Sequence, residues 1–155
     1  MSLIIPDDSY VTLEEANKYH AIRGSYDAWN ALSDEAKIRR LVSASDFLDV
    51  NYHFLNEKID PSQPREFPRK QTGGGDASGV PAQVKTAVFE LALQPDLNQN
   101  EAQKMESVRV GPVSVNYKTE SAVSGNANRF TYVKSLLDLF LDKRSGYGYA
   151  QMLRG

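Results

Sequence analysis

Apolar residues recur at the three- and four-residue spacing of an amphipathic α-helix in four separate segments of the chain. The first segment begins with Thr12 and Glu15, the spacing of a capping box in which each side chain accepts a hydrogen bond from the other residue's backbone amide. It runs through Ile22 and stops at Gly24, which tolerates the left-handed conformation that helix ends commonly need. Residues 27–32 then predict a short helical turn around the only tryptophan of the chain.

Three more helices are predicted from their start signals and their apolar faces. Ser33 can accept a hydrogen bond from the first turn of the second helix, and Pro81 begins the third, where a missing amide proton costs nothing. We expect the last helix to end near Lys143, whose charge suits the negative end of the helix dipole. The expected core faces consist of Ile38, Leu41, Val42, Ser45, Leu48 and Tyr52 in the second helix, Val84, Ala87, Val88, Leu91 and Ala92 in the third, and Phe130, Val133, Leu136, Leu137, Phe140 and Leu141 in the last.

Two segments interrupt the helical pattern in different ways. Residues 60–79 hold seven prolines and glycines, a density that suits neither a helix nor a strand. An irregular stretch of this length inside a compact domain is typical of a functional loop. Residues 106–118 alternate apolar and polar side chains on both sides of Gly111 and Pro112, and this period of two around a turn predicts a β-hairpin.

The whole pattern therefore predicts a mainly α fold. We expect a compact domain of about four helices with a β-hairpin excursion, a long irregular loop and an extended C-terminal tail. A chain of 155 residues is long enough for one domain with a substantial core. We assign residues 1–143 to this helical domain and residues 144–155 to the tail.

Composition narrows the possible functions. Hydrophobic residues make up 41% of the chain and charged residues 25%, and the formal net charge of −2 does not favour a strongly basic nucleic-acid binder. The absence of cysteine excludes disulfides, thiolate zinc sites and cysteine nucleophiles. The first residues lack a basic region and a long apolar run, and no segment is apolar enough to span a bilayer, so we expect neither a secretory signal nor a membrane span.

Patterns for catalysis and for metal binding are weak. Asp46, Asp49 and His53 recur at spacings of three and four, which could place two carboxylates and an imidazole around a divalent ion. The simpler interpretation, which we adopt, is a solvated polar edge of the second helix. Lys70 precedes the glycines at positions 73–75, whereas a phosphate-binding loop has its lysine after them. We therefore expect no enzyme activity, no metal and no cofactor.

The long loop carries a small basic cluster that includes one aromatic residue: Arg65, Phe67, Arg69 and Lys70. Basic and aromatic side chains together can contact single-stranded DNA, and the same loop could contact a neighbouring subunit. Residues 58–85 contain five basic and three acidic residues, which is a weak excess for a DNA-binding groove. The alternative is a solvated loop that Phe67 anchors to the core.

The tail is rich in the residue types that are frequent at protein interfaces. Gly146 and Gly148 give the chain the conformational freedom to leave the domain, and we expect the tail to bind a partner. The alternative is that the tail folds onto its own domain. The candidate contact residues are Tyr147, Tyr149, Met152, Leu153 and Arg154.

Short motifs are spread over most of the chain, to about residue 142. In chain order they are residues 10–20, Trp29, residues 32–37, residues 44–49, residues 67–69, residues 80–87 and residues 110–112. Together they resemble the head–tail connector, or head-completion, family of tailed phages and prophages. The same group is also labelled as DnaT-like single-stranded-DNA-binding proteins. Two features depart from the pattern of the group: Phe67 stands where a tryptophan is common, and the loop contains three consecutive glycines.

The resemblance implies a structural head-to-tail adaptor of a tailed bacteriophage. Such connectors form a ring, expected to be a dodecamer, beneath the portal in the virion neck, and their C-terminal segments dock into the portal. The implied partners are the portal protein, a tail or stopper (nozzle) protein and further copies of the chain, while duplex DNA passes through without specific binding. We expect the isolated chain to be monomeric and to form the ring mainly on the portal. The alternative function is that of a DnaT-like single-stranded-DNA-binding protein.

Overall fold

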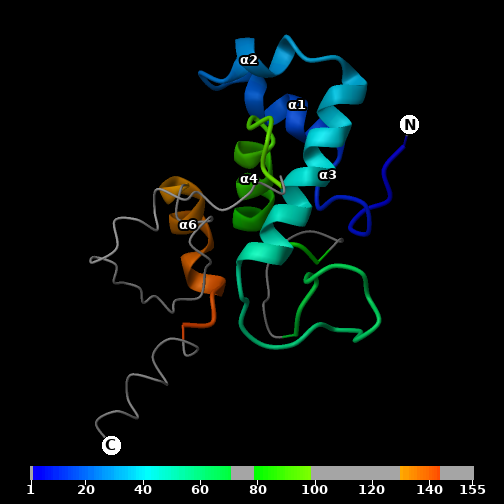
Figure 1. The fold of residues 1–155 in the computed structure, drawn as a ribbon, viewed down its shortest axis with the longest axis vertical. Helices are drawn as coiled ribbons and strands as arrows, with labels where there is room; N and C mark the ends of the chain where they lie inside the picture. Colours follow the sequence, from blue (N-terminus) through cyan, green and yellow to red (C-terminus); the bar gives the residue numbers. More distant parts are fainter. Residues whose placement is uncertain (1, 71–78, 99–129, 144–155) are drawn as a thin grey trace, which may run out of the picture.

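The computed structural model describes residues 2–70, 79–98 and 130–143, and within these ranges the chain is mainly α-helical (Figure 1). The elements are α1 (Leu13–Ala21), α2 (Tyr26–Asn30), α3 (Asp34–Asn51), α4 (Ala82–Leu91), α6 (Thr131–Leu137) and the 3-10 helix η3 (Asp138–Phe140). Isolated antiparallel bridges join Phe54 to Leu141 and Lys58 to Arg69. The predicted hairpin at residues 106–118 and the predicted tail at residues 144–155 lie outside the described residues.

Helices α1 and α3 begin where the sequence predicts, because the expected local hydrogen bonds form. Thr12 Oγ1 accepts a hydrogen bond from the Glu15 amide at 3.0 Å, and Glu15 Oε1 accepts one from the Thr12 amide at 2.9 Å. Ser33 Oγ accepts a hydrogen bond from the Ala36 amide at 3.1 Å at the start of α3. Each bond satisfies an amide that has no partner within the helix, so these residues determine where the helices start.

The end of α1 differs from the prediction. The helix stops one residue before Ile22, whose side chain is 80% exposed instead of belonging to the apolar face. Gly24 does not adopt the left-handed conformation; of the described glycines, only Gly79 has a positive φ. The chain turns through a hydrogen bond from the Arg23 amide to the His20 carbonyl, and this turn needs no left-handed residue.

The core lies where α4 packs between α3 and α6, with α1 and α2 across one end of these helices (Figure 1). The whole predicted face of α4 is buried, although Pro81 is the residue before the helix and not its first residue. The predicted face of α3 is buried except at Val42, which is partly exposed. Helix α2 confirms the short helical turn and buries Trp29 beside α1.

The last helix is shorter than predicted. The α-helix ends with α6 at Leu137, and the 3-10 helix η3 ends at Phe140, so the helical structure does not reach Lys143. An antiparallel bridge between Phe54 and Leu141 follows, flanked by two backbone hydrogen bonds of 2.8 Å. This pairing with the segment after α3 requires extended backbone, which ends the helix. Of the predicted core positions, Val133, Leu137 and Leu141 are buried, and Phe130, Leu136 and Phe140 are partly buried.

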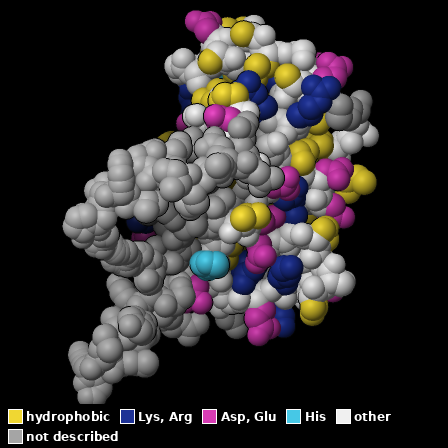
Figure 2. Space-filling view, viewed as in Figure 1, with side chains coloured by type: hydrophobic (Ala, Val, Ile, Leu, Met, Phe, Trp, Pro, Cys, Tyr) yellow, Lys and Arg dark blue, Asp and Glu magenta, His cyan; other side chains and the backbone are white. Residues whose placement is uncertain are grey.

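The surface mixes both signs of charge. On the described part of the face drawn in Figure 2, acidic and basic side chains lie among apolar ones. Among the described helices, none has the length and apolar character that crossing a membrane requires.

Candidate functional site

The candidate site is the loop that follows α3, and its described part is tightly folded. Lys58 and Arg69 form an antiparallel bridge, flanked by hydrogen bonds from the Ile59 amide to the Pro68 carbonyl at 3.2 Å and from the Lys70 amide to the Glu57 carbonyl at 2.8 Å. Residues 57–70 therefore return on themselves. The sequence predicted an irregular loop here, and the structure shows one that is closed by backbone pairing over this range.

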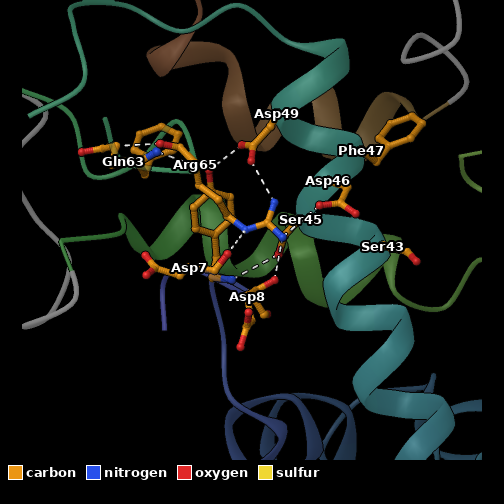
Figure 3. Close-up of polar contacts among 12 residues, drawn as sticks. Asp7, Asp8, Ser43, Ser45, Asp46, Phe47, Asp49, Gln63 and Arg65 are labelled. Carbon is orange, nitrogen blue, oxygen red and sulfur yellow. Dashed lines mark hydrogen bonds and ion pairs between the residues drawn. The ribbon is translucent and has the colours of Figure 1, made fainter. Parts of the chain in front are cut away.

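Arg65 lies at the centre of the site and points into the domain (Figure 3). One guanidinium nitrogen, Nη1, lies 2.9 Å from Asp49 Oδ2, and Nη2 lies 2.9 Å from Asp46 Oδ1. Nε donates to the Asp7 carbonyl at 3.0 Å, and Nη2 also donates to the Asp8 carbonyl at 2.6 Å. The side chain is only 8% exposed, so one arginine joins the loop, α3 and the N-terminal segment from inside.

Tyr10 completes this cluster of polar groups. Its hydroxyl donates to Asp49 and accepts a hydrogen bond from the Phe67 amide at 3.2 Å, while its own amide donates to Ser45 Oγ at 3.1 Å. The Tyr10 ring also lies 5.6 Å from the Arg65 guanidinium carbon, within reach of a cation–π contact. We call Tyr10, Asp46, Asp49 and Arg65 the Arg65 clasp.

Burial determines the electrostatics of the clasp. Burial, followed by the negative charge of Asp49, raises the pKa of Tyr10 well above its ordinary value, so the hydroxyl keeps its proton. Burial also raises the pKa of Asp49, even though Tyr10 and Arg65 both stabilise its charged form. For Arg65 burial works against the charge, but the two carboxylates outweigh it and raise the pKa of the guanidinium. The charge of Arg65 is therefore compensated inside the protein.

The acidic residues considered for a metal site come together around this arginine. Asp46 and Asp49 bind the guanidinium, which occupies the place between them. His53 lies beyond the end of α3 and is exposed, so it does not continue the helical stripe that its spacing suggested. Among the described residues no group of three or more potential ligands could hold a metal ion.

Arg69 has a second structural role in the loop. Its guanidinium donates to the carbonyl groups of Leu55, at 2.7 Å, and of Asn56, and it pairs with Glu66 Oε1 at 2.6 Å. Like Arg65, it exposes only 8% of its side chain. Phe67 is buried and its ring lies 4.8 Å from that of Phe54, so the interpretation that Phe67 anchors the loop to the core is confirmed.

Of the four loop residues considered for DNA or ring contact, only Lys70 is exposed. Its Nζ lies 3.4 Å from a carboxylate oxygen of Glu57, in a pair whose two members are both largely solvated. Sequence analysis missed the structural roles of Arg65 and Arg69. The available signal was the acidic pair on α3, because two carboxylates on one helical face need a cation when a loop covers them.

A second polar cluster that the sequence did not reveal surrounds His20, which is fully buried. Its Nε2 lies 3.1 Å from the Phe89 carbonyl and its Nδ1 lies 2.6 Å from Ser25 Oγ. Since a carbonyl only accepts, Nε2 carries the proton and Nδ1 accepts from the serine. Burial lowers the pKa of His20, and the ring stacks 4.7 Å from that of Trp29. The imidazole is thus a neutral structural group joining α1, α2 and α4.

The candidate contact residues of the tail lie outside the described residues: Tyr147, Tyr149, Met152, Leu153 and Arg154. Within the described residues, the candidate site is the arrangement around Arg65. It holds three chain segments together and leaves little uncompensated positive charge on the described part of the loop.

Comparison with known proteins identifies the family to which the chain belongs. No curated protein and no solved structure matches the chain. The whole chain, residues 1–155, matches the family described as "Putative DnaT-like ssDNA binding protein". The chain belongs to this DnaT-like family.

Proposed function

We propose that this protein is a structural head-to-tail adaptor of a tailed bacteriophage, which forms a ring under the portal in the virion neck and joins the portal to tail components. The observation that carries the proposal is the inward direction of Arg65 and Arg69. The loop that could have gripped DNA instead has its arginines bound to carboxylates and carbonyl groups of its own chain. A domain stabilised in this way suits a rigid building block of a ring.

The charge of the described residues supports the same proposal. They contain twelve Lys and Arg against sixteen Asp and Glu, a formal charge of −4. Proteins that bind single-stranded nucleic acid combine a positive groove with exposed aromatic rings on which bases stack. The described chain exposes two large aromatic side chains, Tyr26 and Tyr132. An acidic body repels phosphates, which suits a ring through which duplex DNA moves without being held.

The proposed partners follow from the adaptor role. The portal protein binds the tail at Tyr147, Tyr149, Met152, Leu153 and Arg154, and a tail or stopper protein binds the opposite side of the ring. Twelve copies form the ring, and each pairwise contact is weak but is reinforced by multivalency on the portal. The chain acts without catalysis, metal or cofactor.

Single-stranded-DNA binding is the second candidate, and the family description favours it. The residues outside the described ranges contain six Lys and Arg against four Asp and Glu, a formal charge of +2. A DnaT-like function would therefore rely mainly on those residues, since the described body is acidic.

Fluorescence anisotropy of a labelled oligonucleotide separates the two candidates. For the adaptor we expect no saturable binding at physiological salt. Micromolar binding that weakens steeply as salt rises would contradict the adaptor and support the DnaT-like function. A matched pair of variants locates any binding: Lys70→Glu reverses an exposed charge of the loop, whereas Lys18→Glu makes the same reversal at an exposed position of α1.

Electron microscopy tests the adaptor directly. Portal-bearing heads mixed with the full chain should gain a ring-shaped density beneath the portal, and heads mixed with the chain truncated after Lys143 should not. Heads that gain no density from the full chain would contradict the proposal. A chain carrying Ile22→Ser, a change at an exposed position that follows α1, serves as the control that should still assemble.

A further inference from the structure

Helix α6 and η3 have an apolar stripe on their outer side. Tyr132 is 56% exposed and Leu139 is 75% exposed, and Leu136, which is partly buried, lies between them. Spacings of four and then three residues place these side chains on one face of a helix. The adjoining face packs into the core through Val133 and Leu137. We call Tyr132, Leu136 and Leu139 the α6 stripe.

The last described residues follow this stripe directly in the chain. The Phe54–Leu141 bridge holds the backbone directly after η3, and the Asp142 amide donates to the His53 carbonyl at 2.8 Å. Residues 144–155 follow within a few positions of Leu139. Twelve residues in extended form reach about 40 Å, whereas the stripe is about 10 Å long. Every part of the stripe is thus within reach of the segment that follows it.

The chemistry of residues 144–155 complements that of the stripe. The segment contains two arginines and no acidic residue. Two acidic residues, Asp138 and Asp142, precede the segment closely in the chain, and Asp138 begins η3. Asp138 is half-exposed and pairs with Lys143 at 3.0 Å, so the site already attracts a cation. The apolar residues available for the stripe are Tyr147, Tyr149, Met152 and Leu153.

We propose that residues 144–155 dock on the α6 stripe of their own chain. Residues 144–155 are joined to the stripe by a short linker, which gives them an effective concentration in the millimolar range. The stripe therefore binds the segment of its own chain in preference to that of a second copy. One consequence rests on the proposed adaptor function: the portal must displace the tail from the stripe before it can bind the tail residues. The stripe then lowers the affinity of the free protein for the portal.

Disulfide trapping in the full-length protein tests the docking. The chain has no cysteine, so the two introduced thiols are the only ones present. We expect the pair Leu139→Cys with Tyr149→Cys to form an intramolecular disulfide at least about tenfold faster than the pair His53→Cys with Tyr149→Cys. His53 is the matched control, because it is exposed, lies outside the stripe, and its carbonyl accepts a hydrogen bond from the Asp142 amide at 2.8 Å, so the tether reaches it as readily as it reaches Leu139. Rates come from non-reducing electrophoresis and mass spectrometry at low protein concentration.

Two results would overturn the docking. Equal rates for the two pairs would show that the segment has no preference for the stripe, and disulfides formed only between chains would assign the stripe to a second copy. A third variant tests the apolar contact: adding Tyr132→Ser should slow the Leu139–Tyr149 pair several-fold, and an unchanged rate would count against the proposal. The assay uses the isolated protein, so its failure would leave the adaptor function, which is tested on portal-bearing heads, unaffected.

Discussion

Arg65→Met should destabilise the protein more than any single change at an exposed charge. Methionine keeps most of the apolar stem of the side chain and removes the guanidinium. Asp49, whose side chain is 15% exposed, then loses its cation, as does Asp46, which is 52% exposed. The carbonyl groups of Asp7 and Asp8 also lose their donors.

The geometry gives the magnitude. Removing one partner of a buried ion pair costs about 3–5 kcal/mol, because the other charge stays buried without compensation. The loss at Asp46 is small, since water solvates about half of that side chain. The hydrogen bonds to the two N-terminal carbonyl groups are only partly buried, so their loss adds little beyond this range. We expect the free energy of unfolding to fall by about 3–5 kcal/mol, a large share of the stability of a domain of this size.

The measurement is urea unfolding followed by circular dichroism, at pH 7 and at pH 4. The change should appear in the midpoint with the slope unchanged. It should also shrink at the lower pH. Unfolded Asp49 titrates near 3.8, and burial without Arg65 raises the pKa of the folded group further above that value. The charged carboxylate therefore costs the folded variant stability at pH 7, and protonation removes that cost as the pH falls through the folded pKa.

Lys70→Met is the matched control, because it removes a cation from an exposed pair of the same loop and should change stability by less than about 0.5 kcal/mol. If Arg65→Met costs less than about 1 kcal/mol, or no more than the control, the clasp does not hold the loop to α3. A loss that is the same at both pH values would mean that packing, and not the uncompensated carboxylate, is responsible.

Three other predictions concern single residues. Thr12→Ala should cost about 1 kcal/mol in urea unfolding by removing one half of the capping box, and no loss would show that the box is energetically idle. Burial lowers the pKa of His20, so the contribution of this residue to stability is fully present above the unfolded pKa of 6.5 and is lost as the pH falls through the folded pKa. The melting temperature should therefore drop from pH 7.5 to pH 5, and it should drop less in His20→Gln. Gly79→Ala should destabilise the protein by more than about 1 kcal/mol, since φ is +80° and the new Cβ would lie 2.8 Å from Pro68 Cβ. Gly24→Ala, with open space around the new Cβ, should be neutral or slightly stabilising. Equal melting temperatures for the two variants would contradict this prediction.

Local features of the chain predicted the helices well. Thr12 and Ser33 mark true helix starts because a cap needs only residues two or three positions away. The buried face of α4 follows from apolar spacing, since a helix that packs between two others must bury its apolar side. The ends were predicted less well. Ile22 and Lys143 were expected to belong to helices but lie beyond the observed helix ends, because turns and a bridge to a distant segment decide where the chain stops being helical.

A mainly α domain, the positions of its helix starts and most of its core can be predicted from the sequence alone, because these features depend on periodicity and on contacts between near neighbours. The roles of the charged residues became clear only from the folded arrangement. Arg65 and Arg69 have the same chemistry in a solvated loop and in a buried one, and the clasp joins Arg65 to Asp49 and Asp7, which lie 16 and 58 positions away. A guanidinium can be buried only where carboxylates and carbonyl groups converge on it, and that convergence exists only after α3, the loop and the N-terminal segment have packed together.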